Sequence, residues 1–454
     1  MASDGQDVGS GGNRLDGDGP DDERLGNNEP RSAKPDRPFF FLGLKGVIGA
    51  SVLFSVLSLI GISFANTTVL VPLLPGLVAS LVIYAAAIGA LGFSARLAVL
   101  ASVWLALCFL WSFGILAIAR IDLVPETIAA VFAVNAVNAL VVAQLIYGVT
   151  VELWRDMSVE AAIRKGLKRW ATPGAVAVAA ILVSLLVLAP LEPVWISTLF
   201  ATGMAVIAAA VPVIFLGLPV SLSHMRFDES SVALANRHRE RRENMLGRLA
   251  ALATPRWAYA VIGIFVVLFA ILVSEGGRAA DLRNAAAVLL WRESGAALGL
   301  SVFAAGLIGA VTARDWRAAL VCMTAPFLLA TWGGVLSYHL QIASLAMSAK
   351  MLVIGGGFGV GMCVLLIDAI GVYRRFEDDV ETASARAVIE SGPVLLVTGL
   401  AIALAAAFFA LLFGELSSAS LVILIEVAGV MVIVPALVSV IDDIFPKRQS
   451  MEEL

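Results

Sequence analysis

Charged residues, cysteines and histidines are all scarce in this sequence. Only 15% of its 454 residues are charged, against about 25% in soluble domains. The three cysteines, Cys108, Cys322 and Cys363, lie inside apolar segments, where pairing on an oxidising aqueous face is not expected. The three histidines are scattered and show no metal-ligand spacing. The sequence therefore argues against a disulfide-stapled domain and predicts no metal or other cofactor.

Apolar residues dominate the chain instead. They make up 60% of it and give a mean hydropathy of +0.93, well beyond the roughly 45–50% apolar content of soluble domains. A helix needs about 20 apolar residues to cross the hydrocarbon core of a membrane. Twelve segments approach that length: 44–65, 72–92, 97–118, 127–149, 173–191, 194–222, 257–275, 295–313, 318–338, 348–373, 392–413 and 418–441. We therefore expect an all-α polytopic membrane protein with about twelve transmembrane helices.

The distribution of Lys and Arg predicts the orientation of these spans. With the N-terminus in the cytoplasm, 26 of the 31 basic residues fall on the cytoplasmic side and five on the outside. Cytoplasmic loops retain positive charge. The bias therefore supports an even number of spans, with both termini cytoplasmic.

Composition also predicts the division of the chain. Residues 1–38 are rich in Gly, Asp, Asn and Pro and are expected to form a disordered cytoplasmic tail, without the apolar core of a secretory signal. Two six-helix halves would span 39–222 and 257–441, followed by a short tail at 442–454. Between the halves, 223–256 is a basic cytoplasmic linker, whose charges suit topology and anionic lipid rather than nucleic acid.

The two predicted halves share an internal repeat. Arg96 precedes Trp111 by fifteen positions, and Arg317 precedes Trp332 by the same fifteen, at an offset of 221. Further matches follow in the same order at offsets of a few residues more. An ordered set of matches favours duplication over chance, and duplicated halves are typical of transporters.

Several of these segments resemble a known family. Trp111-Ser112-Phe113-Gly114, the long fourth span with WRDMSVEAAIRKGLKRWATPGA after it, and the second copy GGGFGVGMCVLLIDAIGVYRRFEDDVETASARAVIESGPVLLVTG are similar to the membrane core of the resistance-nodulation-division (RND) superfamily and its MMPL-like branch. The likeness covers roughly 70–222 and 295–441. It implies two six-helix halves in a bacterial inner membrane, an amphipathic helix after the fourth span of each half, and proton-driven export of hydrophobic or amphiphilic molecules.

The chain departs from that family at two places. Family members carry large extracytoplasmic domains after the first span of each half, whereas the loops here are about ANTTVLVPL and residues 276–294. A partner protein could supply such domains. The family's proton site is an Asp in the middle of the fourth span. This chain has Asn135 and Asn138 there, which cannot change charge with pH, and Cys363 at the position matching Asn138 in the tenth span.

Two acidic residues inside predicted spans are the leading proton-coupling candidates. Asp368 lies in the tenth span, where a carboxylate costs about 2.5–3.5 kcal/mol and tends to face a cavity or a partner. It could instead pair with Arg374 or Arg375 near the cytoplasmic end. Glu426 lies in the last span with no charged residue within ten positions on either side, which suits either a proton-responsive group or a hydrogen-bonded structural one.

Neutral residues add a second set of candidates. Asn135 and Asn138 lie one helical turn apart and could form interhelical hydrogen bonds or line a substrate or proton path. The glycines between 355 and 361 lie within a span and carry no Lys, so they predict close helix packing rather than a phosphate loop.

Three classes of function stay open. The first is an RND/MMPL-like transport protein for a lipid-like or hydrophobic molecule, coupled to protons through Asp368 or Glu426. The second is a non-transporting scaffold or accessory subunit that binds lipid or a partner protein. The third is another twelve-span carrier of the major-facilitator type, although GFSARLAVL lacks that superfamily's G-x-x-x-D-R-x-G-R-R pattern. An enzyme is not expected, because no nucleophile lies beside a base in the sequence.

Overall fold

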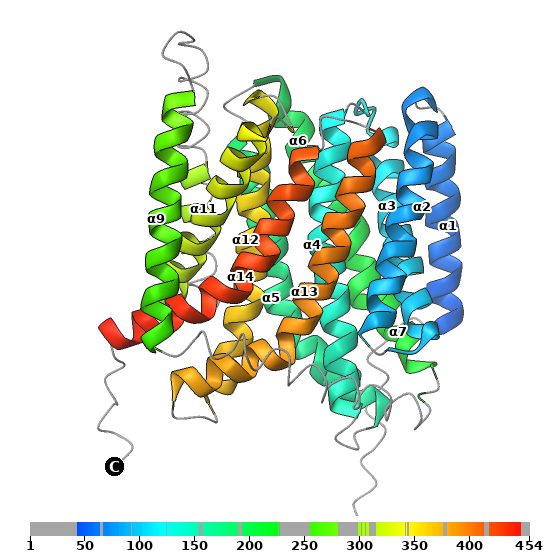
Figure 1. The fold of residues 1–454 in the computed structure, drawn as a ribbon. Helices are drawn as coiled ribbons and strands as arrows, with labels where there is room; N and C mark the ends of the chain where they lie inside the picture. Colours follow the sequence, from blue (N-terminus) through cyan, green and yellow to red (C-terminus); the bar gives the residue numbers. More distant parts are fainter. Residues whose placement is uncertain are drawn as a thin grey trace, which may run out of the picture. The chain divides into compact units, whose positions relative to one another are not determined.

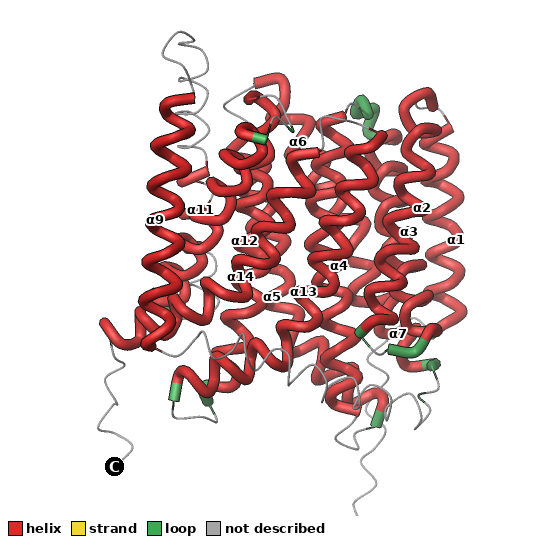
Figure 2. Tube along the Cα trace, in the orientation of Figure 1, coloured by secondary structure: helices red, strands yellow, loops and turns green. Residues whose placement is uncertain are grey.

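A computed structural model describes the chain between residues 43 and 445. It leaves out 64–66, 92, 124, 154–157, 189–192, 226, 228–254, 280–297, 301, 305, 308–314, 341, 343–344, 376–378 and 413–416. The predicted tail 1–38, most of the predicted linker 223–256 and most of the loop 276–294 therefore lie outside the described residues. Those that are described form α-helices joined by short loops, without a strand among them (Figure 2). The predicted all-α polytopic class is confirmed.

The helices of the first half follow the predicted spans. They are α1 (Leu44–Ser63), α2 (Thr67–Ala90), α3 (Ala95–Ile118), α4 (Pro125–Leu153), α5 (Val159–Leu188) and α6 (Pro193–Pro212), continued by the π-helix η2 (Val213–Gly217) and α7 (Leu218–Ser223). The second half has α9 (Pro255–Ala279), α11 (Trp316–His339), α12 (Leu345–Tyr373), α13 (Val380–Leu412) and α14 (Ser417–Ile444). Of the predicted span 295–313, only short helical pieces between 298 and 307 are described. Nine of the described helices are long and apolar enough to cross a membrane.

Two spans begin earlier than the hydropathy predicts. The predicted spans 173–191 and 392–413 belong to helices that start at Val159 and Val380. In each half, the expected amphipathic helix and the span therefore form one continuous helix. Proline lies where the polar part becomes apolar, at Pro173 and Pro393. Proline removes one backbone hydrogen bond and lets a helix bend. The first turns of α13 accordingly run across the direction of its later part (Figure 1).

A side-chain cap fixes the start of α13. The carboxylate of Asp379 accepts hydrogen bonds from the backbone N–H of Thr382 at 3.1 Å and from its hydroxyl at 3.0 Å. Slight burial opposes ionisation of Asp379, but these hydrogen bonds lower its pKa. Such a cap satisfies N–H groups that the first turn of a helix leaves unpaired.

The sixth span contains a π-helical turn. Pro212 ends α6, and the wider turn over Val213–Gly217 follows, with the N–H of Leu218 bonded to the carbonyl of Val213. Single π turns are rare and occur often at functional sites. This one aims Ile214 and Phe215 at a cavity described below.

Equivalent helices of the two halves make equivalent contacts. Helix α3 packs on α1 and α6, as α11 packs on α9 and α14. The two repeated tryptophans share this role. Trp111 donates a hydrogen bond to Ser55 of α1 at 3.1 Å, and Trp332 stacks on Phe265 of α9 with ring centres 4.7 Å apart. The repeat seen in the sequence is thus a repeat of packing.

Helices α4 and α12 are the most enclosed spans. In each of them, 89% of the most apolar stretch is buried within the protein. Helix α12 packs on α5 of the first half as well as on α11 and α14 of the second, and α2 packs on α13. Polar side chains on α4 and α12 therefore face protein rather than lipid.

The glycines of α12 allow its neighbours to approach closely. Gly355 and Gly359 face α14, where a Cβ atom would collide with Val422 and Glu426. Gly357 faces α5, and a Cβ there would lie 2.7 Å from the Cβ of Ser184. The predicted close-packing role of these glycines agrees with this geometry, because small residues let helix backbones come together.

This packing predicts the effect of two alanine substitutions in α12. Gly357→Ala should destabilise the protein by about 1–3 kcal/mol, because α5 must move to admit the methyl group. Gly371→Ala is the matched control, since no atom lies within 4 Å of its new Cβ. Unfolding in a series of mixed detergent micelles would measure both. Equal stability of the two variants would contradict the close contact between α12 and α5.

Candidate functional site

Asn135 and Asn138 form a buried amide pair on α4. The side-chain Nδ2 of Asn138 donates to Oδ1 of Asn135 at 3.3 Å, and neither side chain is more than 1% exposed. The bond lies within α4 and not between helices. It leaves Nδ2 of Asn135 and Oδ1 of Asn138 without a hydrogen-bond partner. An unpaired buried donor and an unpaired buried acceptor are costly in a protein interior.

Each asparagine lines a different apolar cavity. Asn135 lies in the wall of a cavity of about 90 Å³ between the two halves, with α2, α3, α4, α12, α13 and α14 around it. We call it the inter-half cavity. Its wall includes Phe109, Phe132 and Phe409. The ring centres of Phe109 and Phe132 lie 5.0 Å apart, and those of Phe132 and Phe409 lie 3.9 Å apart. Tyr84 also lines it and donates its hydroxyl hydrogen bond to a carbonyl of α4 at 2.9 Å.

The second cavity lies within the first half. It has a volume of about 170 Å³ and lies between α4, α5, α6 and η2. We call it the first-half cavity. Asn138 lies on its α4 wall, and Trp170 of α5 lines it as well. The amide pair thus lies between the two cavities. Each of its asparagines lines one cavity and has one polar atom without a hydrogen-bond partner.

Glu426 of α14 is fully buried against α12. Its carboxyl group lies over Gly359, where any side chain would collide with it, and neither carboxyl oxygen has a hydrogen-bond partner. Cys363, one turn further along α12, lies close enough to interact electrostatically with Glu426. The three cysteines are buried and unpaired. A carboxyl without a hydrogen bond does not match the hydrogen-bonded structural role considered above.

Asp368 lies near the end of α12, among basic side chains. Arg169 of α5 and Arg375 are close enough to act on its charge. Arg374, the other proposed partner, instead contacts Asp442 of α14 at 2.6 Å. The surroundings of Asp368 are therefore those of a charge-balancing group, whereas Glu426 lies among uncharged neighbours.

Tyr373 connects three helices beside Asp368. Its hydroxyl donates a hydrogen bond to the carboxylate of Glu390 in α13. The guanidinium groups of Arg169 and Arg386 lie 6.0 and 5.8 Å from its ring centre, within the range of cation–π attraction. This cluster joins the start of α5 to the end of α12 and the start of α13, and so joins the two halves.

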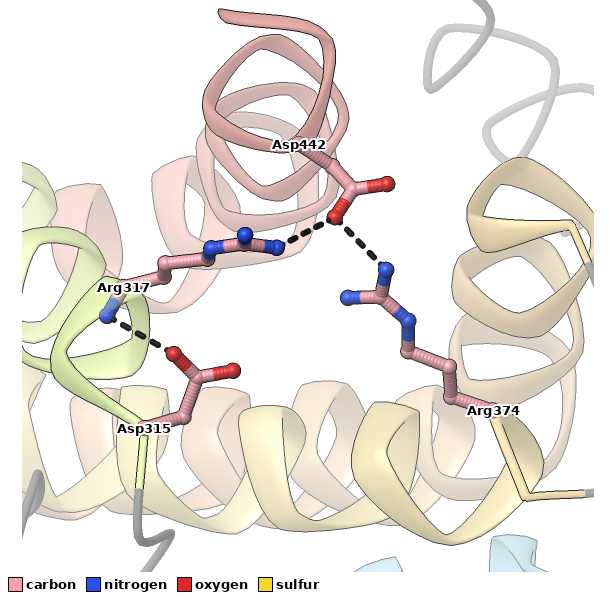
Figure 3. A network of polar contacts seen from close by, with 4 residues as sticks. All are labelled: Asp315, Arg317, Arg374 and Asp442. Carbon is pink, nitrogen blue, oxygen red and sulfur yellow. Dashed lines mark hydrogen bonds and ion pairs between the residues drawn. The ribbon is translucent and has the colours of Figure 1, made fainter. Parts of the chain in front are cut away.

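A network of charged side chains lies where α11 begins and where α12 and α14 end (Figure 3). The Oδ1 atom of Asp442 accepts from Arg317 at 2.8 Å and from Arg374 at 2.6 Å. Asp315 accepts the backbone N–H of Arg317 at 3.1 Å. The network joins α11, α12 and α14. Inspection of the sequence did not single out Asp442.

The repeat itself could have pointed to this position. The offset of 221 pairs Asp442 with Ser221 in the first half. There, the indole N–H of Trp104 in α3 donates to the hydroxyl of Ser221 at 3.2 Å. Both positions accept hydrogen bonds, but from donors at different places in the repeat, because Trp104 corresponds to Ala325 and Arg317 corresponds to Arg96.

Metal ligation finds no support in the part of the chain that the structure describes. Within it, no three His, Cys, Asp or Glu side chains are grouped to hold a metal ion. The arrangement can instead accept apolar molecules beside a few buried polar groups.

Solved structures share this arrangement of helices. The chain aligns with SecDF in its super-membrane-facing form at a TM-score of 0.59, with 13% identity, over 82% of this chain and 62% of that one. It aligns with SecDF from Thermus thermophilus, described as a translocon-associated membrane protein, at a TM-score of 0.59, with 16% identity, over 84% and 63%. The helical core therefore shares its fold with SecDF.

This fold is shared without close sequence similarity. No family model matches the chain, and no curated protein matches it. The chain spans about three fifths of the length of the SecDF chains. At identities of 13% and 16%, the likeness is one of fold, and that fold is of a multi-pass membrane protein.

The ionic network predicts the stability of the second half. Asp442→Asn should lower the free energy of unfolding by about 1.5–3 kcal/mol, the usual contribution of hydrogen bonds to charged groups, because two arginines lose one carboxylate. Asp443→Asn is the control, because Asp443 is exposed and contacts only Tyr259 among the bonds described, at 2.7 Å. Unfolding of both variants in mixed micelles should show the larger loss for Asp442→Asn. The reverse order would contradict the central place of Asp442.

Proposed function

We propose that this protein is an RND/MMPL-like membrane transport protein for a hydrophobic or lipid-like molecule. The observation that carries the proposal is the pair of apolar cavities beside the buried asparagines of α4. Binding sites for apolar ligands are concave, mostly apolar, and contain a few convergent polar groups. Duplicated transporters bind their cargo at the interface between the repeats, and the inter-half cavity lies between the two halves.

We infer that proton coupling, where present, uses Glu426 rather than Asp368. In place of the acidic residue of the fourth span, α4 carries two amides that cannot change charge. Glu426 is the buried carboxyl that faces α12 at its glycines, with both oxygens unpaired. Asp368 lies beside Arg169 and Arg375, so it has basic neighbours that can balance its charge, whereas Glu426 lies among uncharged neighbours. The predicted inner-membrane location, with basic loops in the cytoplasm, is part of the same proposal.

A second candidate function is that of an accessory subunit. The loop between α1 and α2 is three residues long, from 64 to 66, and 18 residues separate α9 from the next described helical turn. Neither connection can hold a large domain. One SecDF neighbour is described as translocon-associated and is longer than this chain. Together with a partner that contributes extracytoplasmic domains, this chain would form a complex comparable in size to that SecDF chain.

Transport is tested in proteoliposomes that carry a fluorescent lipid in one leaflet and a pH dye inside. An imposed pH gradient should speed lipid movement and proton uptake together in the wild-type protein. Glu426→Gln should reduce both by about tenfold or more, because it removes the ionisable group from the membrane interior. Glu160→Gln is the control, since Glu160 is exposed at the start of α5. Equal rates with and without protein would contradict transport of this lipid, and full activity of Glu426→Gln would remove Glu426 from the coupling.

The accessory role is tested by mass spectrometry of the protein purified gently from its native membrane. A stoichiometric partner with a large extracytoplasmic domain is the expected result for an accessory subunit. One enriched lipid class without any such partner would contradict the accessory role and would favour a self-contained permease.

A further inference from the structure

The first-half cavity has the size and surface of a site for part of a hydrocarbon chain. Its volume is about 170 Å³, and an apolar cavity of about 150 Å³ can bind benzene. Most of its wall consists of aliphatic side chains from α4, α5 and α6, such as Val141, Val178, Leu182 and Ile207. A chain segment of about six to eight carbon atoms would fill it.

The cavity opens sideways, on the surface that would face lipid. Ala175 on α5, Val211 on α6 and Phe215 on η2 line it and are exposed on the outside of the bundle. Val211 is 47% exposed and Phe215 is 38% exposed. A molecule in the bilayer can therefore reach the cavity between α5 and α6.

The π-helical turn lies at this opening. Ile214 is buried on the inner side of the cavity, and its neighbour Phe215 lies at the mouth. Gly217 packs directly on the ring of Trp104, which fixes the far end of the turn.

The polar groups of the cavity are few and uncharged. Oδ1 of Asn138 and the indole Nε1 of Trp170 are buried and have no hydrogen-bond partner. No Asp, Glu, Lys or Arg lies among its lining residues. A charged headgroup in the cavity would therefore lose its hydration without gaining a counter-charge, whereas a neutral hydroxyl could donate to Asn138.

We propose that the first-half cavity binds a neutral, single-chain amphiphile, such as a long-chain alcohol, with its hydroxyl group hydrogen-bonded to Asn138 and its chain leaving between α5 and α6. This inference deepens the proposed function by naming a class of substrate. Binding itself does not require transport. The charged headgroup of a phospholipid is excluded from the cavity.

The proposal is tested by photolabelling of the full-length protein in lipid nanodiscs. The probe is a long-chain alcohol with a diazirine and an alkyne on its chain. Its sulfate ester is the charged comparison, and its methyl ether cannot donate a hydrogen bond. Labelled peptides are identified by mass spectrometry. We expect the alcohol to label α5 and α6 about tenfold more than the sulfate does, and about fivefold more than the ether does.

Variants separate the cavity from the general lipid-facing surface. Val178→Phe fills the cavity and should reduce labelling of α5 and α6 about tenfold. Val82→Phe makes the same change at a lipid-facing position of α2 that is 62% exposed, and should leave labelling unchanged. Asn138→Leu should abolish the advantage of the alcohol over the ether. A size-exclusion profile and thermal unfolding of each variant show that it is folded.

Three results would overturn the proposal. They are equal labelling by the alcohol and its sulfate, labelling spread over all lipid-facing helices, and an unchanged pattern in folded Val178→Phe. The fluorescent-lipid assay is read on the same preparations. Specific labelling without lipid movement would support the site while contradicting transport, and lipid movement without labelling would do the opposite.

Discussion

In a hydrocarbon surrounding, apolar side chains gain little by leaving lipid for another helix, so membrane helices are held together by close contact and by polar bonds. In this protein the closest contacts lie on α12. Its glycines admit α14 on one side and α5 on the other, and α5 belongs to the first half. The contact between the halves therefore depends on glycines, which have no side chain. The enclosure of α4 and α12, and the buried positions of their polar groups, depend on that contact.

The buried polar groups are organised around this contact in two different ways. Inside the bundle they are uncharged or isolated, as with the amide pair of α4 and the single carboxyl of α14. At the end where α12 and α14 finish, they are charged and paired, as around Asp442 and Tyr373. The paired charges fix helix ends to one another. The unpaired amide atoms belong to residues that line cavities, where a bound molecule could complete their hydrogen bonds.

Much of this fold could be predicted from the sequence, because a bilayer imposes length and polarity on each helix. The described spans match the predicted ones within a few residues, except for the two helices that begin earlier and continue through Pro173 and Pro393. The candidates Asn135, Asn138 and Glu426 could be found because polar side chains are rare in spans. Their surroundings could not be predicted. Which cavity each asparagine lines, and which glycine Glu426 covers, depend on helix rotation and crossing, which hydropathy does not encode.

Duplication has also left the two halves chemically unequal. In the first half, the hydroxyl of Ser221 accepts from an indole N–H of α3, whereas in the second half Asp442 accepts from two arginines. Dissolved ions screen exposed and partly exposed charges over about 8 Å at physiological salt, and they leave neutral hydrogen bonds almost unaffected. Ionic strength therefore weakens the bonds around Asp442 more than the bond between Trp104 and Ser221.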